Sequence, residues 1–228
     1  VVIVDLQENA AKQAAETLQS KGFEAFAVAG DVTSEAAIQS SIEQTMSHYG
    51  RIDIVINNAG MQHVSPIEEF STEKFDLLQS IMLRAPFLYT KYVFPIMKKQ
   101  GFGLILNMSS INGLIGFAGK AAYNSAKHGV IGLTKVAALE GATSGITVNA
   151  ICPGYVLTPL VEKQIPDTAK ARGITEEEVK RDVLLKAQPT KKFVTVEQLG
   201  EAVLFLCSDA AASITGSSLS MDGGWTAQ

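Results

Sequence analysis

The sequence predicts an α/β fold with a doubly wound parallel sheet in a single domain, and three observations indicate it. Short runs rich in Val and Ile alternate with stretches of helix-forming residues along the whole chain. These runs contain few polar residues, as expected of parallel strands that helices cover on both faces. No internal repeat, low-complexity tract or linker interrupts the alternation, so residues 1–228 form one predicted domain.

Hydrophobic periodicity and capping residues place the elements of the first half. A strand is predicted at residues 1–4, and it begins with no lead-in. The predicted elements that follow are a helix at 7–20, a strand at 25–29, a helix capped by Thr33 or Ser34 and ending near Tyr49, and a strand at 53–56. A long helix starts at Ser71 or Thr72 and runs to about residue 99. We expect it to be broken or bent near Pro86 and Pro95, because proline removes a helical N–H donor.

The second half continues the alternation. Strands are predicted at residues 104–108, 146–151 and 217–221, and helices at 121–141 and 195–208. Residues 160–186 are charged and irregularly helical and contain no predicted strand. We interpret this segment as a lid, inserted at about residues 158–190. A simple surface excursion would have the same composition.

Composition excludes several classes of protein. Hydrophobic residues make up 46% of the chain and charged residues 18%, which is enough apolar material for a covered sheet. The net charge is −4 and no dense run of Lys or Arg occurs, so we expect no nucleic-acid partner. No apolar stretch reaches about 18 residues, so no membrane span is expected. Cys152 and Cys207 lack metal-binding spacing, which favours reduced thiols, a cytoplasmic protein and no metal site.

Ser110, Tyr123 and Lys127 are the strongest candidates for chemistry. Ser110 follows a predicted buried strand, and the carboxyl end of such a strand is where doubly wound folds place their sites. Tyr123 and Lys127 are four residues apart and lie on one face of the predicted helix, one turn apart. A tyrosine acid/base, a cation that lowers its pKa and a hydroxyl that holds the reacting oxygen form a proton-transfer site for an alcohol or a carbonyl.

These residues occur with further motifs in a fixed order. The motifs are Asn57-Asn58-Ala59-Gly60 after a strand, Ser110, the Tyr123-x-x-x-Lys127 pair, and Pro153-Gly154 with Thr158 after the next strand. In this order they resemble the short-chain dehydrogenases/reductases along nearly the whole chain, which implies a Rossmann-like fold. Within that family, residues 57–68, 119–135, 146–165 and 222–228 are most similar to the bacterial enzymes that act on D-3-hydroxybutyrate.

The resemblance implies a further unit before Val1. Members of the family begin with a strand and a Gly-rich turn that holds the cofactor pyrophosphate at a helix N-terminus. This sequence starts at what resembles the second strand, so we expect about 30 residues, one strand–helix unit, to be absent. The absent strand would be central, between the first and third strands present. A disordered start and a truncated gene product are the alternatives.

The resemblance also implies NAD as the cofactor. Asp5 follows the first strand, where the family uses an acid to bind the adenosine ribose and to repel a 2′-phosphate. Alternatively, Asp5 caps the N-terminus of the helix that follows it. The other cofactor-binding residues implied are Asp31, Val32, Asn57, Ala59, Gly60, Tyr123, Lys127, Pro153, Val156 and Thr158.

In the implied mechanism, Tyr123 takes the proton from the substrate hydroxyl, and Ser110 orients the same oxygen. Lys127 lowers the pKa of Tyr123, which must fall by about 3 units, or roughly 4 kcal/mol, to work near neutrality. Oxidised nicotinamide adds positive charge. Met82 stands where the family usually has an asparagine, so we expect a modified proton relay. Alternatively, Met82 is simply part of the core.

A 3-hydroxy acid brings a carboxylate that needs a cation and amide donors. The resemblance places Gln62, Lys120 and Gln164 around it, with Asn112 where relatives often have a histidine. Ser110 and Tyr123 complete the implied substrate-binding residues. Asn112 can donate a hydrogen bond to the carboxylate but, unlike a protonated histidine, carries no charge.

The expected function is NAD-dependent oxidation of (R)-3-hydroxybutyrate to acetoacetate, as in ketone-body metabolism, by a homotetramer that assembles, as the resemblance implies, through its long helices and its C-terminal strand. One alternative is the same fold reducing another carbonyl, such as a 3-oxoacyl thioester or a sugar. Another is a degenerate, non-catalytic member of the family.

Overall fold

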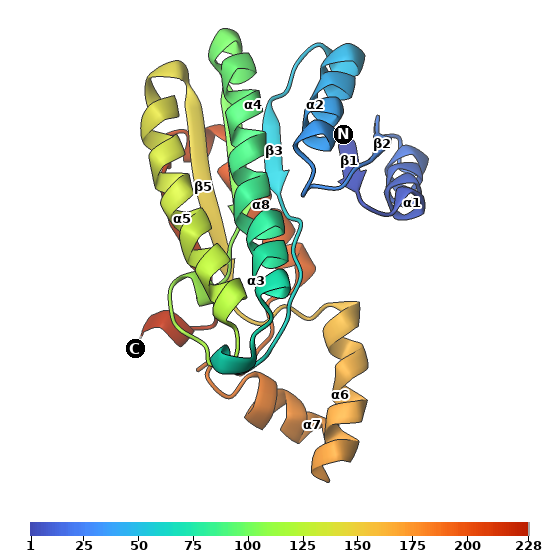
Figure 1. Cartoon of the computed structure of the whole chain (residues 1–228), viewed down its shortest axis with the longest axis vertical. Helices are drawn as coiled ribbons and strands as arrows, with labels where there is room; N and C mark the ends of the chain where they lie inside the picture. The colour runs from blue at the N-terminus through green and yellow to red at the C-terminus, as the bar shows by residue number, and fades with distance from the viewer. Residues whose placement is uncertain (228) are drawn as a thin grey trace.

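A computed structural model describes residues 1–227, with the side chains of residues 159, 160, 163, 164 and 171 outside the described part. The strands and helices alternate along the chain, as predicted (Figure 1). The strands are β1 (Val2–Asp5), β2 (Phe26–Ala29), β3 (Ile54–Asn57), β4 (Gly103–Met108), β5 (Ile146–Pro153) and β6 (Ser218–Met221). Every strand pair is parallel, which confirms the predicted α/β class.

The strands form two sheets. β1 pairs with β2, and the second sheet has the order β3-β4-β5-β6. Within residues 1–227 no hydrogen-bonded ladder joins β1 to β3, and Ile54 and Ile56 of β3 are 45% and 46% exposed. The strand–helix unit expected between these two strands stays a prediction.

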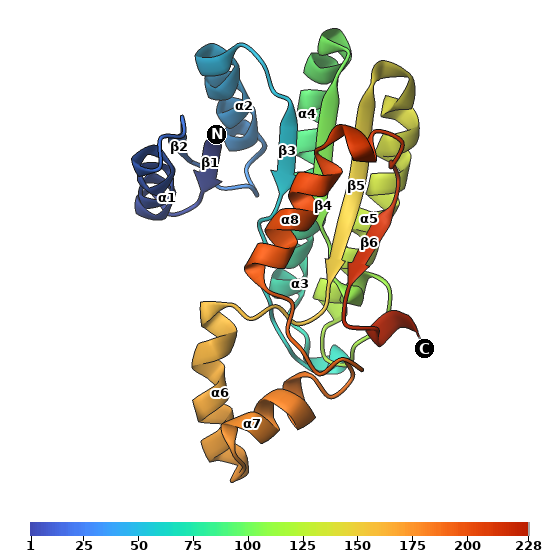
Figure 2. The ribbon, with the colours of Figure 1, turned by 180° about the vertical axis from the view of Figure 1, so that it is seen from behind.

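Helices cover both faces of the larger sheet. α4 (Ala85–Gln100) and α5 (Ala121–Gly141) lie on one face, and α8 (Val196–Leu206) lies on the other, as the two opposite views show (Figures 1 and 2). α2 (Glu35–Tyr49) packs beside α4, and α1 (Glu8–Ser20) packs on the smaller sheet. None of the helices in residues 1–227 is long and apolar enough to cross a bilayer.

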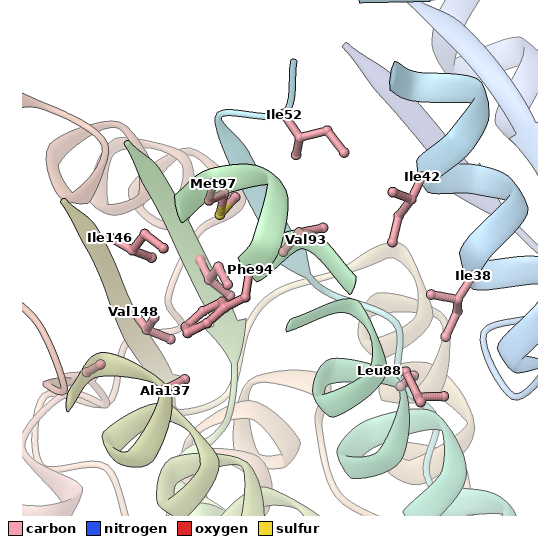
Figure 3. Close-up of a cluster of buried hydrophobic side chains, with 13 residues drawn as sticks. Ile38, Ile42, Ile52, Leu88, Val93, Phe94, Met97, Ala137, Ile146 and Val148 are labelled. Carbon is pink, nitrogen blue, oxygen red and sulfur yellow. The ribbon is translucent and has the colours of Figure 1, made fainter. Parts of the chain in front are cut away.

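The main core lies between the larger sheet and its helices (Figure 3). Its buried side chains come from α2, α4, α5, β4 and β5, and include Ile38, Ile42, Val93, Phe94, Met97, Ile105, Ala137, Ile146 and Val148. The packing is close at Gly103, where any Cβ would lie 2.4 Å from the sulfur of Met97. This contact explains why β4 begins with glycine, since a larger residue would push α4 off the sheet.

The long helix predicted from residue 72 differs from the expectation. It is divided into α3 (Thr72–Gln79), a π-helical turn at Ser80–Arg84, and α4. Pro86 has no N–H to offer the carbonyl of Met82 four residues earlier, which accounts for the wide turn at this point. α4 continues through Pro95 to Gln100, so the helix is not broken there, and a bend at Pro95 stays a prediction.

The segment interpreted as a lid contains α6 (Pro159–Arg172), α7 (Glu176–Glu178) and a π-helical turn at Val179–Leu184. It extends beyond the carboxyl end of the larger sheet (Figures 1 and 2). Ile165, Ala169 and Val179 form its own small hydrophobic cluster. Whether this segment closes over a site stays a prediction.

Candidate functional site

Ser110, Tyr123 and Lys127 come together where β4 ends and α5 begins. Ser110 is buried at the start of a short 3₁₀ turn (Ile111–Gly113), and its Oγ accepts a hydrogen bond from the Asn112 N–H at 3.2 Å. Tyr123 and Lys127 lie one turn apart on α5, with the Lys127 Nζ 5.5 Å from the Tyr123 ring centroid. The spacing of the two residues therefore produces the proximity that the sequence indicated.

Burial determines the proton affinities at this point. It raises the pKa of Tyr123, and the nearby Ser110 hydroxyl opposes this increase only in part. Lys127 is 5% exposed, and burial lowers its pKa to about 8. Its ammonium donates a hydrogen bond to the Met108 carbonyl at 2.5 Å. The lowered Tyr123 pKa expected from Lys127 is therefore opposed by desolvation, so the site needs additional positive charge before Tyr123 can act as a base near neutrality.

A pocket of about 140 Å³ opens beside these residues. Its walls include five of the substrate residues implied by the sequence: Gln62, Ser110, Asn112, Lys120 and Tyr123. The sixth, Gln164, lies outside the described side chains. The other lining residues are Ile111, Phe117, Gly154, Tyr155, Val156, Val161 and Trp225.

Aromatic rings surround the Lys120 ammonium in this pocket. Its Nζ lies 4.2 Å from the Phe117 ring centroid, 5.9 Å from that of Tyr123 and 6.0 Å from that of Tyr155. Burial lowers the pKa of Lys120, and the ring faces partly compensate its lost hydration. The ammonium is thus placed to bind an anionic group inside a small pocket lined by both polar and aromatic side chains.

Sequence reasoning missed Phe117, Tyr155 and Trp225. The ring of Trp225 stacks on that of Tyr155 at a centroid distance of 6.0 Å, and it meets Phe117 edge-on at 6.4 Å. The Asp222 carboxylate holds the turn around Trp225 by accepting hydrogen bonds from the Thr226 N–H and Oγ. The available signal was the position of these aromatic residues shortly after predicted strand ends, where a ligand pocket is expected.

The residues implied for a dinucleotide lie at the same, carboxyl edge of both sheets. Asp5 ends β1 and is exposed, and its Oδ1 accepts a hydrogen bond from the Gln7 N–H at 2.8 Å. Asp31 follows β2 and accepts from the N–H and hydroxyl of Thr33. Val32, next to it, packs against the main core. None of these residues lines the 140 Å³ pocket, so they form a separate part of the site.

The turn after β3 leaves room for a ligand. A Cβ at Gly60 would lie 3.6 Å from the Met82 sulfur, an ordinary contact, so the packing of this protein does not require glycine there. Asn57, at the start of the turn, donates from its amide to the Asn107 side chain, and Ala59 is exposed beside Gly60. An open backbone, carboxylates for ribose hydroxyls and the Lys127 ammonium are a set of groups that fits a dinucleotide.

Three implied cofactor residues, Pro153, Val156 and Thr158, lie at or just after the end of β5. Pro153 is buried at the strand end, and Val156 pairs with Val194 in an isolated bridge and lines the pocket. Thr158 begins α6, where its hydroxyl accepts a hydrogen bond from the Val161 N–H at 3.4 Å. This stretch therefore connects the pocket with the proposed lid.

Met82 belongs to the core, as one of the two expectations had it. It is 1% exposed and packs with Leu78, Ala122 and Ala126 behind Tyr123. Because Pro86 offers no N–H, the Met82 carbonyl lacks its normal helical donor.

The described residues contain no group of three or more His, Cys, Asp or Glu side chains arranged for a metal ion.

Comparisons with known proteins place the chain among oxidoreductases. A family model described as "Enoyl-(Acyl carrier protein) reductase" matches residues 1–226. The chain is 52% identical over 228 residues to "Uncharacterized oxidoreductase YxjF" of Bacillus subtilis, covering 100% of this chain and 89% of that protein. It is 53% identical over 198 residues to "D-beta-hydroxybutyrate dehydrogenase" of Rhizobium meliloti, covering 87% and 77%.

A solved structure extends the likeness to the fold. Sorbitol-6-phosphate 2-dehydrogenase SrlD from Erwinia amylovora superposes with a TM-score of 0.91 at 32% identity, covering 99% of this chain and 90% of that one. The fold and the sequence relationships together define an oxidoreductase of the Rossmann-like class. The chain belongs to the short-chain dehydrogenase/reductase family, whose members generally use NAD or NADP.

Proposed function

We propose that the protein oxidises (R)-3-hydroxybutyrate to acetoacetate in a reversible reaction that uses NAD. The observation that carries the proposal is the Lys120 ammonium, which shares a pocket of about 140 Å³ with Ser110 and Tyr123. That pocket suits a small substrate with an anionic group near the reacting alcohol. The identity of 53% to the enzyme from Rhizobium meliloti gives further support.

The proposed mechanism assigns one role to each polar side chain. A nicotinamide dinucleotide, bound along the carboxyl edge of the strands, supplies the hydride acceptor. The Tyr123 phenol oxygen removes the proton of the substrate hydroxyl, and the Ser110 hydroxyl holds the same substrate oxygen. Lys127 supplies positive charge one helical turn away and offers an ammonium to ribose hydroxyls. Together these groups orient the alcohol and hold its proton in a place shielded from water.

The carboxylate end of the substrate is bound opposite the reacting carbon. Lys120 provides the charge, while Gln62 and Asn112 provide amide groups in the same wall. Gln164 is retained in this group as a proposal from the sequence. Residues 158–190 act as a lid in this proposal, because they begin shortly after the pocket residue Val156 and include the pocket residue Val161.

Replacing Lys120 by methionine tests the substrate. Lys120→Met keeps the length of the side chain and removes its charge, so kcat/KM for (R)-3-hydroxybutyrate is expected to fall about 100-fold, the loss of a charge-assisted contact. The kcat/KM for a neutral secondary alcohol such as 2-butanol is expected to change much less. Steady-state rates of NADH formation measure both values.

The matched control for this variant is Lys99→Met, at the exposed end of α4. It is expected to leave both substrates unaffected. Equal losses with the acid and the neutral alcohol in Lys120→Met would contradict the proposed carboxylate contact.

The cofactor preference is tested at Asp5. Asp5→Asn keeps an oxygen for the Gln7 N–H and removes the negative charge that would repel a 2′-phosphate. The ratio of kcat/KM for NADP to that for NAD is expected to rise by about tenfold or more, since one unit charge a few ångströms away contributes about 1–2 kcal/mol in a partly hydrated site. Kinetics with each cofactor in turn measure this ratio.

Asp53→Asn is the control, because Asp53 lies at the opposite, amino end of β3 and pairs with Arg51. A cofactor ratio that stays equal in Asp5→Asn and the wild type would remove Asp5 from the proposed ribose site.

Reduction of another carbonyl, such as a 3-oxoacyl thioester or a sugar, is the second candidate. An identity of 36% over 194 residues to "3-oxoacyl-[acyl-carrier-protein] reductase FabG" of Thermotoga maritima supports it. The small pocket around a desolvated lysine suits a free acid better than a long acyl group. A substrate panel that includes an acetoacetyl thioester separates the two, and turnover of any substrate excludes a non-catalytic protein.

We also propose a homotetramer assembled through α4 and α5. The outer face of these helices exposes Phe87, Val136 and Leu139, which are 48%, 54% and 81% accessible. Phe87 also lines a groove of about 550 Å³, together with Leu83, Leu133 and the polar residues Asp76, Gln79, Ser80 and Arg84. An apolar face of this kind supports contact with a second copy.

A further inference from the structure

A line of hydrogen bonds, partly buried at β3 and fully buried beyond it, runs behind the candidate site from β3 through β4 to α5. The Asn57 Nδ2 donates to the Asn107 Oδ1 at 2.7 Å, and the Asn107 Nδ2 donates to the Thr134 Oγ1 at 2.9 Å. The Thr134 hydroxyl then donates to the Val130 carbonyl at 2.7 Å. Asn107 and Thr134 are both 0% exposed. We call Asn57, Asn107 and Thr134 the polar ladder.

The polar ladder is part of a larger joint between β4 and α5. Lys127 donates to the carbonyl of Met108, and the Ser109 hydroxyl donates to the carbonyl of Lys127 at 3.0 Å. Three successive residues, 107 to 109, thus hold α5 through polar contacts, and the next residue along the chain is Ser110. A Cβ at Gly113 would lie 2.5 Å from the Lys127 carbonyl oxygen, so the loop after Ser110 presses on the same joint.

Apolar packing alone would not determine where α5 lies along the strand. The contacts of Val130, Ile131 and Ala137 with the sheet side are buried but non-directional, and such contacts tolerate small shifts of a helix. Hydrogen bonds require defined distances and angles, and a buried bond that is not made is costly. Thr134 lies seven residues after Lys127, two turns along the same face of α5. The hydrogen bond of Thr134 therefore fixes the rotation of α5 about its axis and its position along the strand, and with them the position of Lys127.

We propose that Asn107 and Thr134 are positioning residues, which set the place of Tyr123 and Lys127 relative to Ser110. The inference rests on the proposed catalytic roles of those three residues. Asn57 extends the effect to the turn at residues 57–60, because the same ladder begins there. The donors all point in one direction, so each bond polarises the next and the three elements behave as one rigid support.

Thr134→Val tests the proposal, since valine keeps the shape of threonine and removes its hydroxyl. We expect kcat for (R)-3-hydroxybutyrate to fall at least about tenfold, because small displacements of catalytic groups have large effects on rate. The KM values for the acid and for NAD are expected to stay within about twofold. The apparent pKa of the basic group in the pH profile of kcat is expected to shift, as the Tyr123–Lys127 geometry changes. Thr134→Ser restores the hydroxyl and is expected to recover the wild-type kcat and pH profile.

Thr90→Val is the matched control. Thr90 is a buried helical threonine in α4 whose hydroxyl donates to the Pro86 carbonyl at 2.7 Å. The variant removes the same kind of intrahelical bond, and among the described residues the Thr90 hydroxyl makes no bond to a strand. It is expected to lower thermal stability to a degree similar to Thr134→Val, while leaving kcat and the pH profile unchanged.

A Thr134→Val protein whose kcat and pH profile match those of Thr90→Val would overturn the proposal. If Thr134→Val does not fold, Thr134→Ala replaces it, since alanine also removes the hydroxyl and is well tolerated in a helix. An unchanged kcat and pH profile in Thr134→Ala would then overturn the proposal as well. A wild-type protein that oxidises no secondary alcohol would overturn the proposed function and the positioning role together, whereas an active wild type with unaffected variants overturns the positioning role alone.

Discussion

Tyr123→Phe is expected to lower kcat for the oxidation of (R)-3-hydroxybutyrate by about a thousandfold or more, with little change in the KM for the acid. The phenol oxygen is the proposed proton acceptor, and general base catalysis contributes about 10²–10⁴-fold to such reactions. Phenylalanine keeps the ring that packs with Ala122 and Ala126, so the fold is expected to persist. Steady-state kinetics measure the loss, and NADH binding followed by fluorescence verifies that the site is intact.

Tyr155→Phe provides the comparison within the same pocket. Burial raises the pKa of Tyr155 as it does that of Tyr123. The Tyr155 ring is one of the rings around Lys120, but its hydroxyl has no proposed role in proton transfer. Its kcat is expected to stay within about fivefold of the wild type. Retention of more than about a tenth of wild-type kcat by Tyr123→Phe would show that another group removes the proton.

Lys127→Met is expected to abolish most activity and at the same time to stabilise the protein. A buried ammonium whose main compensation is one carbonyl makes folding less favourable at neutral pH. The pKa of Lys127 is about 8 in the folded protein and 10.5 in its ordinary state. We therefore expect the free energy of unfolding at pH 7 to rise by about 1–3 kcal/mol on substitution, while kcat falls at least about 100-fold.

The same pKa determines how stability depends on pH. Between pH 8 and 10.5 the unfolded chain binds more protons at this lysine than the folded protein does. Stability of the wild type is therefore expected to rise with pH across this window, by up to about 3 kcal/mol from this group. Urea unfolding at pH 7 and at about pH 9.5 measures the difference, which should be absent in Lys127→Met.

Lys135→Met, an exposed lysine on the same helix, controls for the loss of one positive charge. It is expected to change neither kcat nor the pH dependence of stability. A Lys127→Met protein that is less stable than the wild type at pH 7 would mean that the bond to the Met108 carbonyl outweighs the desolvation of the ammonium.

Much of the fold could be predicted from the sequence because its signals are local. The strand runs and the cap at Ser34 indicated their elements to within about two residues, and α5 has the bounds that were predicted. The missing N–H of Pro86 was visible in the sequence, and it predicted an interruption of the helix at this point. The form of the interruption, a π-helical turn at Ser80–Arg84, was not predictable, because a proline can break, bend or widen a helix.

The candidate site was predictable where it depends on spacing along one element. The interval of four residues between Tyr123 and Lys127 was enough to place both on one face. The ring of Trp225 approaches Phe117 from a loop more than a hundred positions away, and no periodicity connects them. The direction of the Tyr123 pKa shift depends on total burial, which only the folded arrangement determines.

Trp225 is the single tryptophan of the chain, and it lies in the wall of the candidate-site pocket against Tyr155 and Phe117. Selective excitation of indole therefore observes this pocket and no other part of the molecule. The protein carries its own optical probe, so ligand entry and local loosening of the pocket can be followed by emission without any attached dye. Unfolding that begins at the distant β1–β2 sheet would not change the indole emission. A comparison of the unfolding curves from indole emission and from circular dichroism would therefore show whether the two sheets unfold together.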